Sequence, residues 1–139
     1  MAGEFFIDTS AWYPLLVRRH ADHARISGAL KAQVQRRRRV LTTNLVVAEA
    51  HALIMRWEGR KAALIGLQHM DESTDVMVYS TPQWEAIARR DWIERYTDQD
   101  FSLTDAVSFT VMRENRIADV LTLDQHFAAA GFTMLPEPG

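Results

Sequence analysis

The sequence predicts an α/β protein with a mostly parallel central sheet and helices on both faces of that sheet. Short, continuous apolar segments alternate along the chain with longer segments whose apolar residues recur at helical spacing. Polar and acidic residues follow several of the apolar segments directly. In a parallel sheet such residues gather at one edge, where ligands bind. The pattern therefore predicts both a fold class and the edge of the sheet that carries the site.

The predicted strands are short apolar segments bounded by polar or turn-forming residues. The first strand spans 3–8 and contains Phe5, Phe6 and Ile7 in a row, as in a strand that is buried on both faces. The remaining strands are predicted at 40–42, 76–79, 120–122 and 132–135. Because a helical segment separates most neighbouring strands, parallel pairing is the expected arrangement.

Helices are predicted between these strands, at 10–18, 21–35, 44–57, 60–70, 82–96, 102–113 and 125–129. Pro14 fits the first helix only in its first turn, because an interior proline removes a backbone hydrogen bond. Thr43 or Asn44 is the expected N-cap of the third helix. The apolar stripe of that helix continues to Trp57. Trp57, like Phe109 on the sixth helix, is therefore expected to fill the core.

The composition narrows the class of protein. A hydrophobic content of 47% over 139 residues predicts a single folded domain, 1–139, with its own core. Because the chain has no cysteine, disulfides, thiolate zinc sites and cysteine nucleophiles are excluded. No apolar stretch reaches membrane-spanning length, and the N-terminus lacks the features of a signal peptide. We therefore expect a cytoplasmic protein without membrane contact.

Acidic residues stand in short apolar contexts at widely spaced positions, namely Asp8, Glu49, Asp105 and Asp124. Two of them come at or just past the ends of predicted strands and two lie near the starts of predicted helices, so all of them can reach one crevice at the sheet edge. Carboxylates about 4 Å apart repel by about 4 kcal/mol at an effective dielectric constant of ~20. A divalent cation offsets this repulsion and uses the oxygens as ligands, which suits Mg²⁺ or Mn²⁺.

Each acid also has a structural explanation. Asp8 and Asp124 can cap the helices that follow them, and Asp105 can close a capping box with Ser102. Capping does not explain Glu49, which lies about a turn inside its helix. Taken one at a time, the acids other than Glu49 favour the structural explanation. Taken together, they favour a shared metal.

Other polar residues lie near these acids in the sequence. Thr9, Ser10 and Thr122 can orient the carboxylates, although ordinary strand-end and capping roles fit them equally well. Asp100 either adds to the site or extends a solvated acidic run. His126 is interpreted as a structural histidine rather than a ligand.

A run of four arginines, Arg36, Arg37, Arg38 and Arg39, precedes the second predicted strand. Such a run attracts a polyanion, and contact with phosphates is its expected use in RNA binding. The alternative is a solvated helix end.

With these residues placed, the chain resembles the PIN-domain ribonucleases, in particular the VapC-like toxins of bacterial toxin–antitoxin pairs. The resemblance runs almost from end to end. It rests on four segments in order: Ile7-Asp8-Thr9-Ser10, Thr43-Asn44-Leu45-Val46-Val47-Ala48-Glu49, Ser102-Leu103-Thr104-Asp105-Ala106 and Leu121-Thr122-Leu123-Asp124-Gln125-His126-Phe127. It implies a three-layer α/β/α sandwich. It also places the acidic quartet of the family on Asp8, Glu49, Asp105 and Asp124.

The resemblance further implies a metal-dependent endoribonuclease, in which one or two Mg²⁺ or Mn²⁺ ions activate water for hydrolysis of RNA. Thr122 matches a hydroxyl position beside the metal. A homodimer and a cognate antitoxin protein across the acidic groove are implied as well. The alternative is a non-catalytic PIN-like RNA-binding or interaction module, against which the intact quartet argues. An aspartyl phosphatase expects an acid where Ser10 stands, and a phosphotransfer receiver expects a lysine after Lys61.

Overall fold

A computed structural model describes residues 3–138, and these form one five-stranded sheet in the order β3-β2-β1-β4-β5. All neighbouring strands pair in parallel. The strands are β1 (Glu4–Ile7), β2 (Arg39–Thr43), β3 (Val76–Val78), β4 (Asp119–Leu121) and β5 (Thr133–Leu135). Each lies within about one residue of a predicted strand, so the predicted sheet is confirmed.

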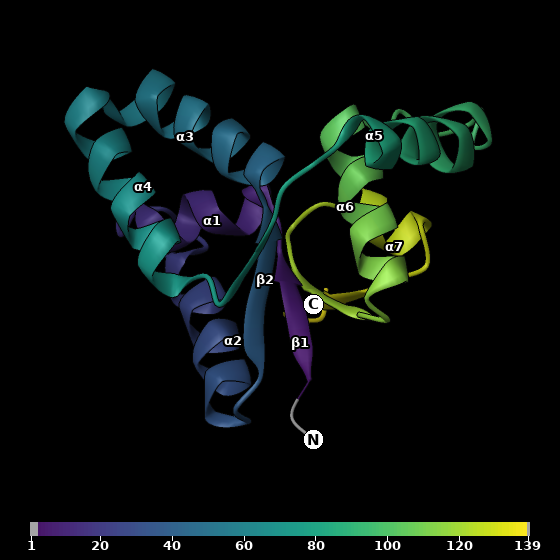
Figure 1. Ribbon diagram of the computed structural model, residues 1–139. Helices are drawn as coiled ribbons and strands as arrows, with labels where there is room; N and C mark the ends of the chain where they lie inside the picture. The colour runs from purple at the N-terminus through teal and green to yellow at the C-terminus, as the bar shows by residue number, and fades with distance from the viewer. Residues whose placement is uncertain (1–2, 139) are drawn as a thin grey trace.

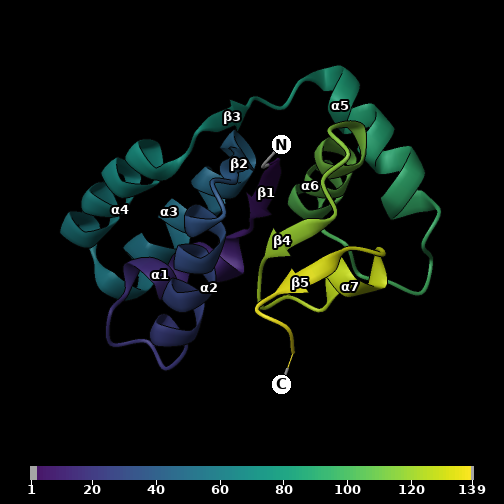
Figure 2. The same cartoon turned by 90° about the horizontal axis from the view of Figure 1, so that it is seen from below.

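Helices cover both faces of the sheet (Figure 1). One layer contains α1 (Thr9–Leu16), α2 (His23–Gln35), α3 (Asn44–Glu58) and α4 (Arg60–Ser73). The other contains α5 (Pro82–Ala88), the π-helix η1 (Arg89–Glu94), α6 (Leu103–Glu114) and α7 (His126–Ala129). Figure 2 shows the same two layers from below, separated by the strands. The predicted three-layer α/β/α sandwich is therefore confirmed.

The connections between strands place a topological switch point between β1 and β4, which pair directly. From β1 the chain proceeds to β2 and then β3 on one side, whereas from β4 it proceeds to β5 on the other side. Loops that leave two such strands in opposite directions open a crevice at their carboxyl ends. Asp8 follows β1 and Thr122 follows β4, so the sequence delivers both residues to this crevice.

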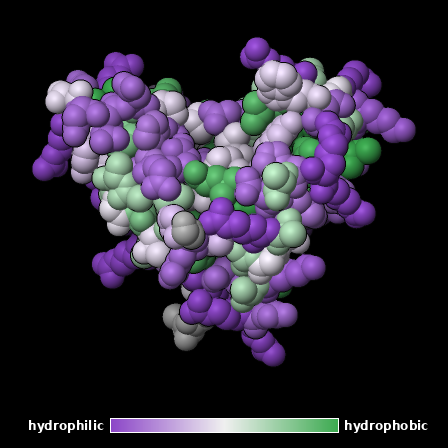
Figure 3. Space-filling view, turned by 180° about the vertical axis from the view of Figure 1, so that it is seen from behind, coloured by the Kyte–Doolittle hydropathy of each residue, from purple (hydrophilic) through white to green (hydrophobic). Residues whose placement is uncertain are grey.

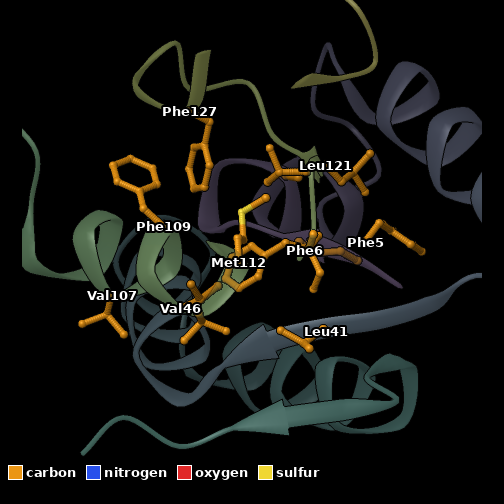
Figure 4. Close-up of a cluster of buried hydrophobic side chains, with 14 of the residues drawn as sticks. Phe5, Phe6, Leu41, Val46, Val107, Phe109, Met112, Leu121 and Phe127 are labelled. Carbon is orange, nitrogen blue, oxygen red and sulfur yellow. The ribbon is translucent and has the colours of Figure 1, made fainter. Parts of the chain in front are cut away.

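The core between the sheet and the second helical layer is built around α6, which is buried from Asp105 to Met112. Phe109 is fully buried, and its ring lies 4.9 Å from that of Phe127 between centroids. Figure 4 shows these two rings together with Met112 and the strand residues Phe6 and Leu121. This packing fixes α6 against the sheet and with it the first turn that carries Asp105.

Several local predictions differ from the structure. Trp57 is 62% exposed rather than part of the core, because the buried stripe of α3 ends at Ile54. The Arg56 guanidinium instead lies over the Trp57 ring, 5.3 Å from its centroid. Pro14 lies inside α1 rather than in its first turn, and α1 ends soon afterwards at Leu16. The predicted helix 82–96 changes from α-helix to π-helix at Arg89.

Among residues 3–138, no helix combines the length and the apolar character that crossing a bilayer requires.

Candidate active site

Asp8 lies at the junction of β1 and α1 and serves two roles there. It is the N-cap of α1 and accepts a hydrogen bond from the backbone N–H of Ser10 at 3.4 Å. The hydroxyls of Ser10 and Thr122 also donate to the same carboxylate oxygen, Oδ2, at 2.9 and 3.1 Å. The Asp8 residue is only 3% exposed. The helix cap predicted for Asp8 is therefore confirmed, and the capping carboxylate is buried at the switch point.

Burial raises the pKa of Asp8 from its ordinary value of 3.8 to about 7. The hydrogen bond from the Ser10 side chain opposes this rise, whereas the nearby charge of Asp105 adds to it. The energetic cost of a charged Asp8 is thus incompletely offset by its hydrogen bonds. A cation bound beside Asp8 and Asp105 would offset that cost directly.

Ser10 and Thr122 connect the start of α1 to the end of β4. Their hydroxyl oxygens are 3.0 Å apart. The Ser10 hydroxyl accepts from the backbone N–H of Leu123 at 2.9 Å, and the Thr122 hydroxyl accepts from that of Asp124 at 2.9 Å. These contacts hold the Asp8 carboxylate in one orientation. By contrast, the Thr9 hydroxyl turns away and donates to the Val46 carbonyl of α3 at 3.5 Å.

Asp105 closes the capping box predicted at the start of α6. Its N–H donates to the Ser102 hydroxyl at 3.0 Å, and its Oδ2 accepts from the Ser102 N–H at 3.2 Å. The same Oδ2 lies 3.1 Å from Nδ1 of His126. Its side chain is 11% exposed and influences the pKa of Asp8 electrostatically. The box therefore fixes one carboxylate oxygen of Asp105 beside the switch point.

Asp124 and Asp105 both lie close to the imidazole of His126. The Asp124 Oδ1 accepts from the backbone N–H of His126 at 2.9 Å and lies 3.6 Å from the Nδ1 of its ring. One ligand atom from each of these three residues lies within 4.8 Å of the other two, a spacing that suits a shared metal ion. Sequence reasoning placed Asp124 here but interpreted His126 as structural. The position of His126, two residues after Asp124, is the feature of the sequence that could have indicated a ligand.

The remaining predicted acids lie farther from this group. Glu49 is an exposed residue of α3, about one turn beyond Val46, to which Thr9 bonds. Among residues 3–138, Glu49 is not part of the group formed by Asp105, Asp124 and His126. Asp100 is exposed in the loop before Ser102, consistent with the solvated alternative.

The arginine run lies at the opposite end of the sheet from the acids. Arg39 begins β2 and pairs with Glu4, the first residue of β1, at 2.7 Å. The Arg38 guanidinium donates to Gln33 Oε1 and Asp119 Oδ2 at 2.7 and 2.8 Å, and its side chain is 11% exposed. These contacts argue against RNA binding by Arg38. Arg36 and Arg37 are exposed, and their predicted contact with RNA stays a prediction.

The crevice between the two helical layers is accessible from outside. Figure 3 shows, from behind, a notch between the two upper lobes of the molecule, at the end of the sheet where β1 terminates. The donor set in this region consists of carboxylates with one imidazole. Carboxylate oxygens are the preferred ligands of Mg²⁺ and Mn²⁺, so the residues present fit a divalent cation.

Comparison with known proteins identifies relatives over nearly the whole chain. The model of the family described as "PIN domain" matches residues 5–133. Two strains of Mycobacterium tuberculosis, CDC 1551 / Oshkosh and H37Rv, each contain a "23S rRNA-specific endonuclease VapC20". This relative is 34% identical over 128 residues, which cover 91% of this chain and 94% of the relative.

A solved structure has the same fold. The crystal structure of Mycobacterium tuberculosis VapC20, described as a "Sarcin-Ricin loop cleaving toxin", superposes with a TM-score of 0.83. The sequence identity in this comparison is 29%, and the alignment covers 93% of this chain and 96% of the other.

Proposed function

Because the chain belongs to the PIN-domain family, we propose that it is a metal-dependent endoribonuclease that hydrolyses RNA as the toxin of a toxin–antitoxin pair. The observation that carries this proposal is the burial of Asp8 at the switch point. Burial raises the pKa of Asp8, and the nearby charge of Asp105 raises it further. A carboxylate that only caps a helix has no need of such burial, because burial disfavours its charged form. For a carboxylate that binds a metal, the bound cation offsets the free-energy cost of burying its charge.

In this proposal one or two Mg²⁺ or Mn²⁺ ions are held by the acidic quartet of Asp8, Glu49, Asp105 and Asp124. Such an ion supplies a water molecule of lowered pKa and offsets the negative charge that develops on the phosphate. Hydrolysis of this kind gives products with a 5′-phosphate and a 3′-hydroxyl. Glu49 is the member whose assignment depends most on the family, because α3 leaves it exposed.

The protein's own part in the reaction is to hold the carboxylates in place. The hydrogen bonds from Ser10 and Thr122 converge on Oδ2 of Asp8 and hold that oxygen in place. The backbone N–H of Ser102 donates to Oδ2 of Asp105 and holds that oxygen beside His126. These partners do not contact substrate in this proposal; they limit the motion of the ligands, and preorganised ligands lose less freedom on binding.

For the substrate we propose the sarcin–ricin loop of 23S ribosomal RNA, since the VapC20 relative is described as cleaving that loop. The proposed partner is a cognate antitoxin protein that covers the acidic crevice, and the proposed assembly is a homodimer in the cytoplasm. Family membership supports the antitoxin and the dimer. Exposed apolar side chains on the α3–α4 hairpin offer surface for a protein contact; they are Met55, Trp57, Leu64 and Ile65.

A synthetic RNA hairpin that carries the sarcin–ricin loop tests this function. With Mg²⁺ or Mn²⁺ we expect cleavage within the loop, and with excess chelator a loss of rate of at least about 100-fold, because the electrostatic stabilisation disappears. Adding metal back should restore the rate. End-group analysis of the products should find a 5′-phosphate.

A hairpin with the same stem and an unrelated loop is the matched control. Equal cleavage in the presence and absence of chelator contradicts the metal role. Metal-dependent cleavage of total RNA without cleavage of this hairpin contradicts the proposed substrate alone. Binding of RNA without any cleavage would favour the non-catalytic alternative.

A further inference from the structure

We propose that His126 is a nitrogen ligand of the same metal centre and that its imidazole makes the centre prefer Mn²⁺ over Mg²⁺. This inference rests on the proposed function, since it concerns the metal that the carboxylates would hold. It adds a ligand outside the acidic quartet that the family resemblance assigns. It also replaces the interpretation of His126 as a structural histidine.

The spacing of the side-chain atoms is the first argument. Nδ1 of His126 lies 3.1 Å from Oδ2 of Asp105 and 3.6 Å from Oδ1 of Asp124. In an octahedral site with metal–ligand distances of about 2.1 Å, adjacent ligand atoms lie about 3.0 Å apart. Nδ1 is therefore spaced from each of the two carboxylate oxygens roughly as neighbouring ligands of one ion are.

The orientation of the imidazole is the second argument. The His126 ring meets the ring of Phe101 edge to face, with centroids 5.3 Å apart and an interplanar angle of 83°. Phe101 is 7% exposed and packs in turn on the buried Phe109 at 4.9 Å. The backbone of His126 is held as well, because its N–H donates to Asp124. These contacts direct Nδ1 toward the acids while the side chain stays 33% exposed to the crevice.

The chemistry of imidazole gives the expected selectivity. Mg²⁺ is bound mainly by oxygen ligands, whereas imidazole suits softer divalent metals such as Fe²⁺, Ni²⁺, Cu²⁺ and Zn²⁺. Mn²⁺, from the same transition row, is less strictly limited to oxygen than Mg²⁺. Mn²⁺ accepts carboxylate oxygens and also gains from a nitrogen donor. A centre made of carboxylates and His126 should therefore bind Mn²⁺ more tightly than an all-oxygen centre does, with little gain for Mg²⁺.

A positioning role is the competing explanation. In that case His126 donates an N–H to Asp105 and merely holds the carboxylate in place. His126→Asn separates the two roles, because the asparagine amide can still donate to Asp105 but offers no imidazole nitrogen. His69→Asn is the matched control, since His69 is an exposed histidine of α4.

Pulsed electron paramagnetic resonance of the Mn²⁺-loaded, RNA-free protein reads the ligand directly. We expect a nitrogen hyperfine coupling of coordinated imidazole in the wild type, its replacement by a ¹⁵N coupling after histidine labelling, and its loss in His126→Asn alone. Bound Mn²⁺ without this coupling in the wild type would overturn the proposal. Retention of the coupling in His126→Asn would do so too, because another histidine would then be the ligand.

Calorimetric titration of the same proteins reads the selectivity. We expect His126→Asn to lose about tenfold or more in Mn²⁺ affinity and less than about threefold in Mg²⁺ affinity, with His69→Asn unchanged. Equal losses for both metals would assign His126 a positioning role and overturn the proposal. If the wild type binds neither metal, the metal centre itself fails, and the proposed function fails with it.

Discussion

Asp8→Asn is expected to abolish RNA cleavage and at the same time to stabilise the metal-free protein at pH 8. The loss of activity should be at least about 100-fold, because the variant removes a ligand charge at the centre of the site. The gain in stability has a separate cause. Asparagine keeps an oxygen that can accept from Ser10 and Thr122, but it carries no charge that burial can penalise.

The pH dependence follows from the raised pKa of Asp8. Between its ordinary pKa of 3.8 and the folded-state pKa of about 7, the folded protein binds more protons at this group than the unfolded chain does. The free energy of unfolding therefore falls as pH rises through this window. The full difference corresponds to about 4 kcal/mol. Asp8→Asn removes this term, so its advantage should be large at pH 8 and small near pH 4.

Denaturant unfolding in excess chelator at several pH values measures this advantage, and cleavage of the sarcin–ricin hairpin measures the activity. Asp98→Asn is the control, because it removes the same charge from an exposed loop residue and should change neither quantity. A variant that cleaves normally contradicts the role of Asp8. A variant that is inactive but less stable at pH 8 than the wild type contradicts the uncompensated burial of its charge.

Phe109→Ala is expected to lower the free energy of unfolding by about 3–5 kcal/mol, because it leaves a cavity at the centre of the core. Phe109 is fully buried, and four aromatic rings surround it at centroid distances of 4.9 to 5.7 Å: Trp92, Phe101, Phe127 and Phe132. For a chain of this length the loss corresponds to a fall in melting temperature of about 10–20 °C.

The matched control is Trp57→Ala, which removes a larger aromatic side chain that is 62% exposed. We expect a change of less than about 1 kcal/mol there. Thermal and denaturant unfolding of both variants measure the contrast. Similar losses at the two positions would mean that the aromatic cluster around α6 is not the centre of stability.

The sheet was predictable because its strands are short apolar runs that carry their signal locally. Phe5, Phe6 and Ile7 are all fully buried in β1, as their uninterrupted order indicates. The helix starts were predictable for the same reason, since Thr43 and Ser102 accept the capping hydrogen bonds expected of them. Local patterns failed where packing decides. The apolar periodicity of α3 includes Trp57, but it does not show how far along the helix the packing elements extend.

The site was predictable in part. Asp8 and Asp124 reach one region because they follow parallel strands that end at a common edge, which the order of elements already implies. Asp105 joins them from the first turn of α6. The aim of the His126 ring depends on its contact with Phe101, which lies far from it in the sequence. Likewise Arg38 pairs with Asp119, which lies 81 residues away in the sequence. The arginine run alone therefore does not indicate that Arg38 is engaged within the fold.

The most direct test is a crystal structure of the protein soaked with Mn²⁺, with anomalous diffraction recorded at the manganese edge. We expect an anomalous peak in the crevice between β1 and β4, about 2.2 Å from a carboxylate oxygen of each of Asp8, Asp105 and Asp124. Manganese bound only elsewhere, or a crevice that stays empty at saturating Mn²⁺ while these side chains point apart, would contradict a shared cation and with it the proposed nuclease.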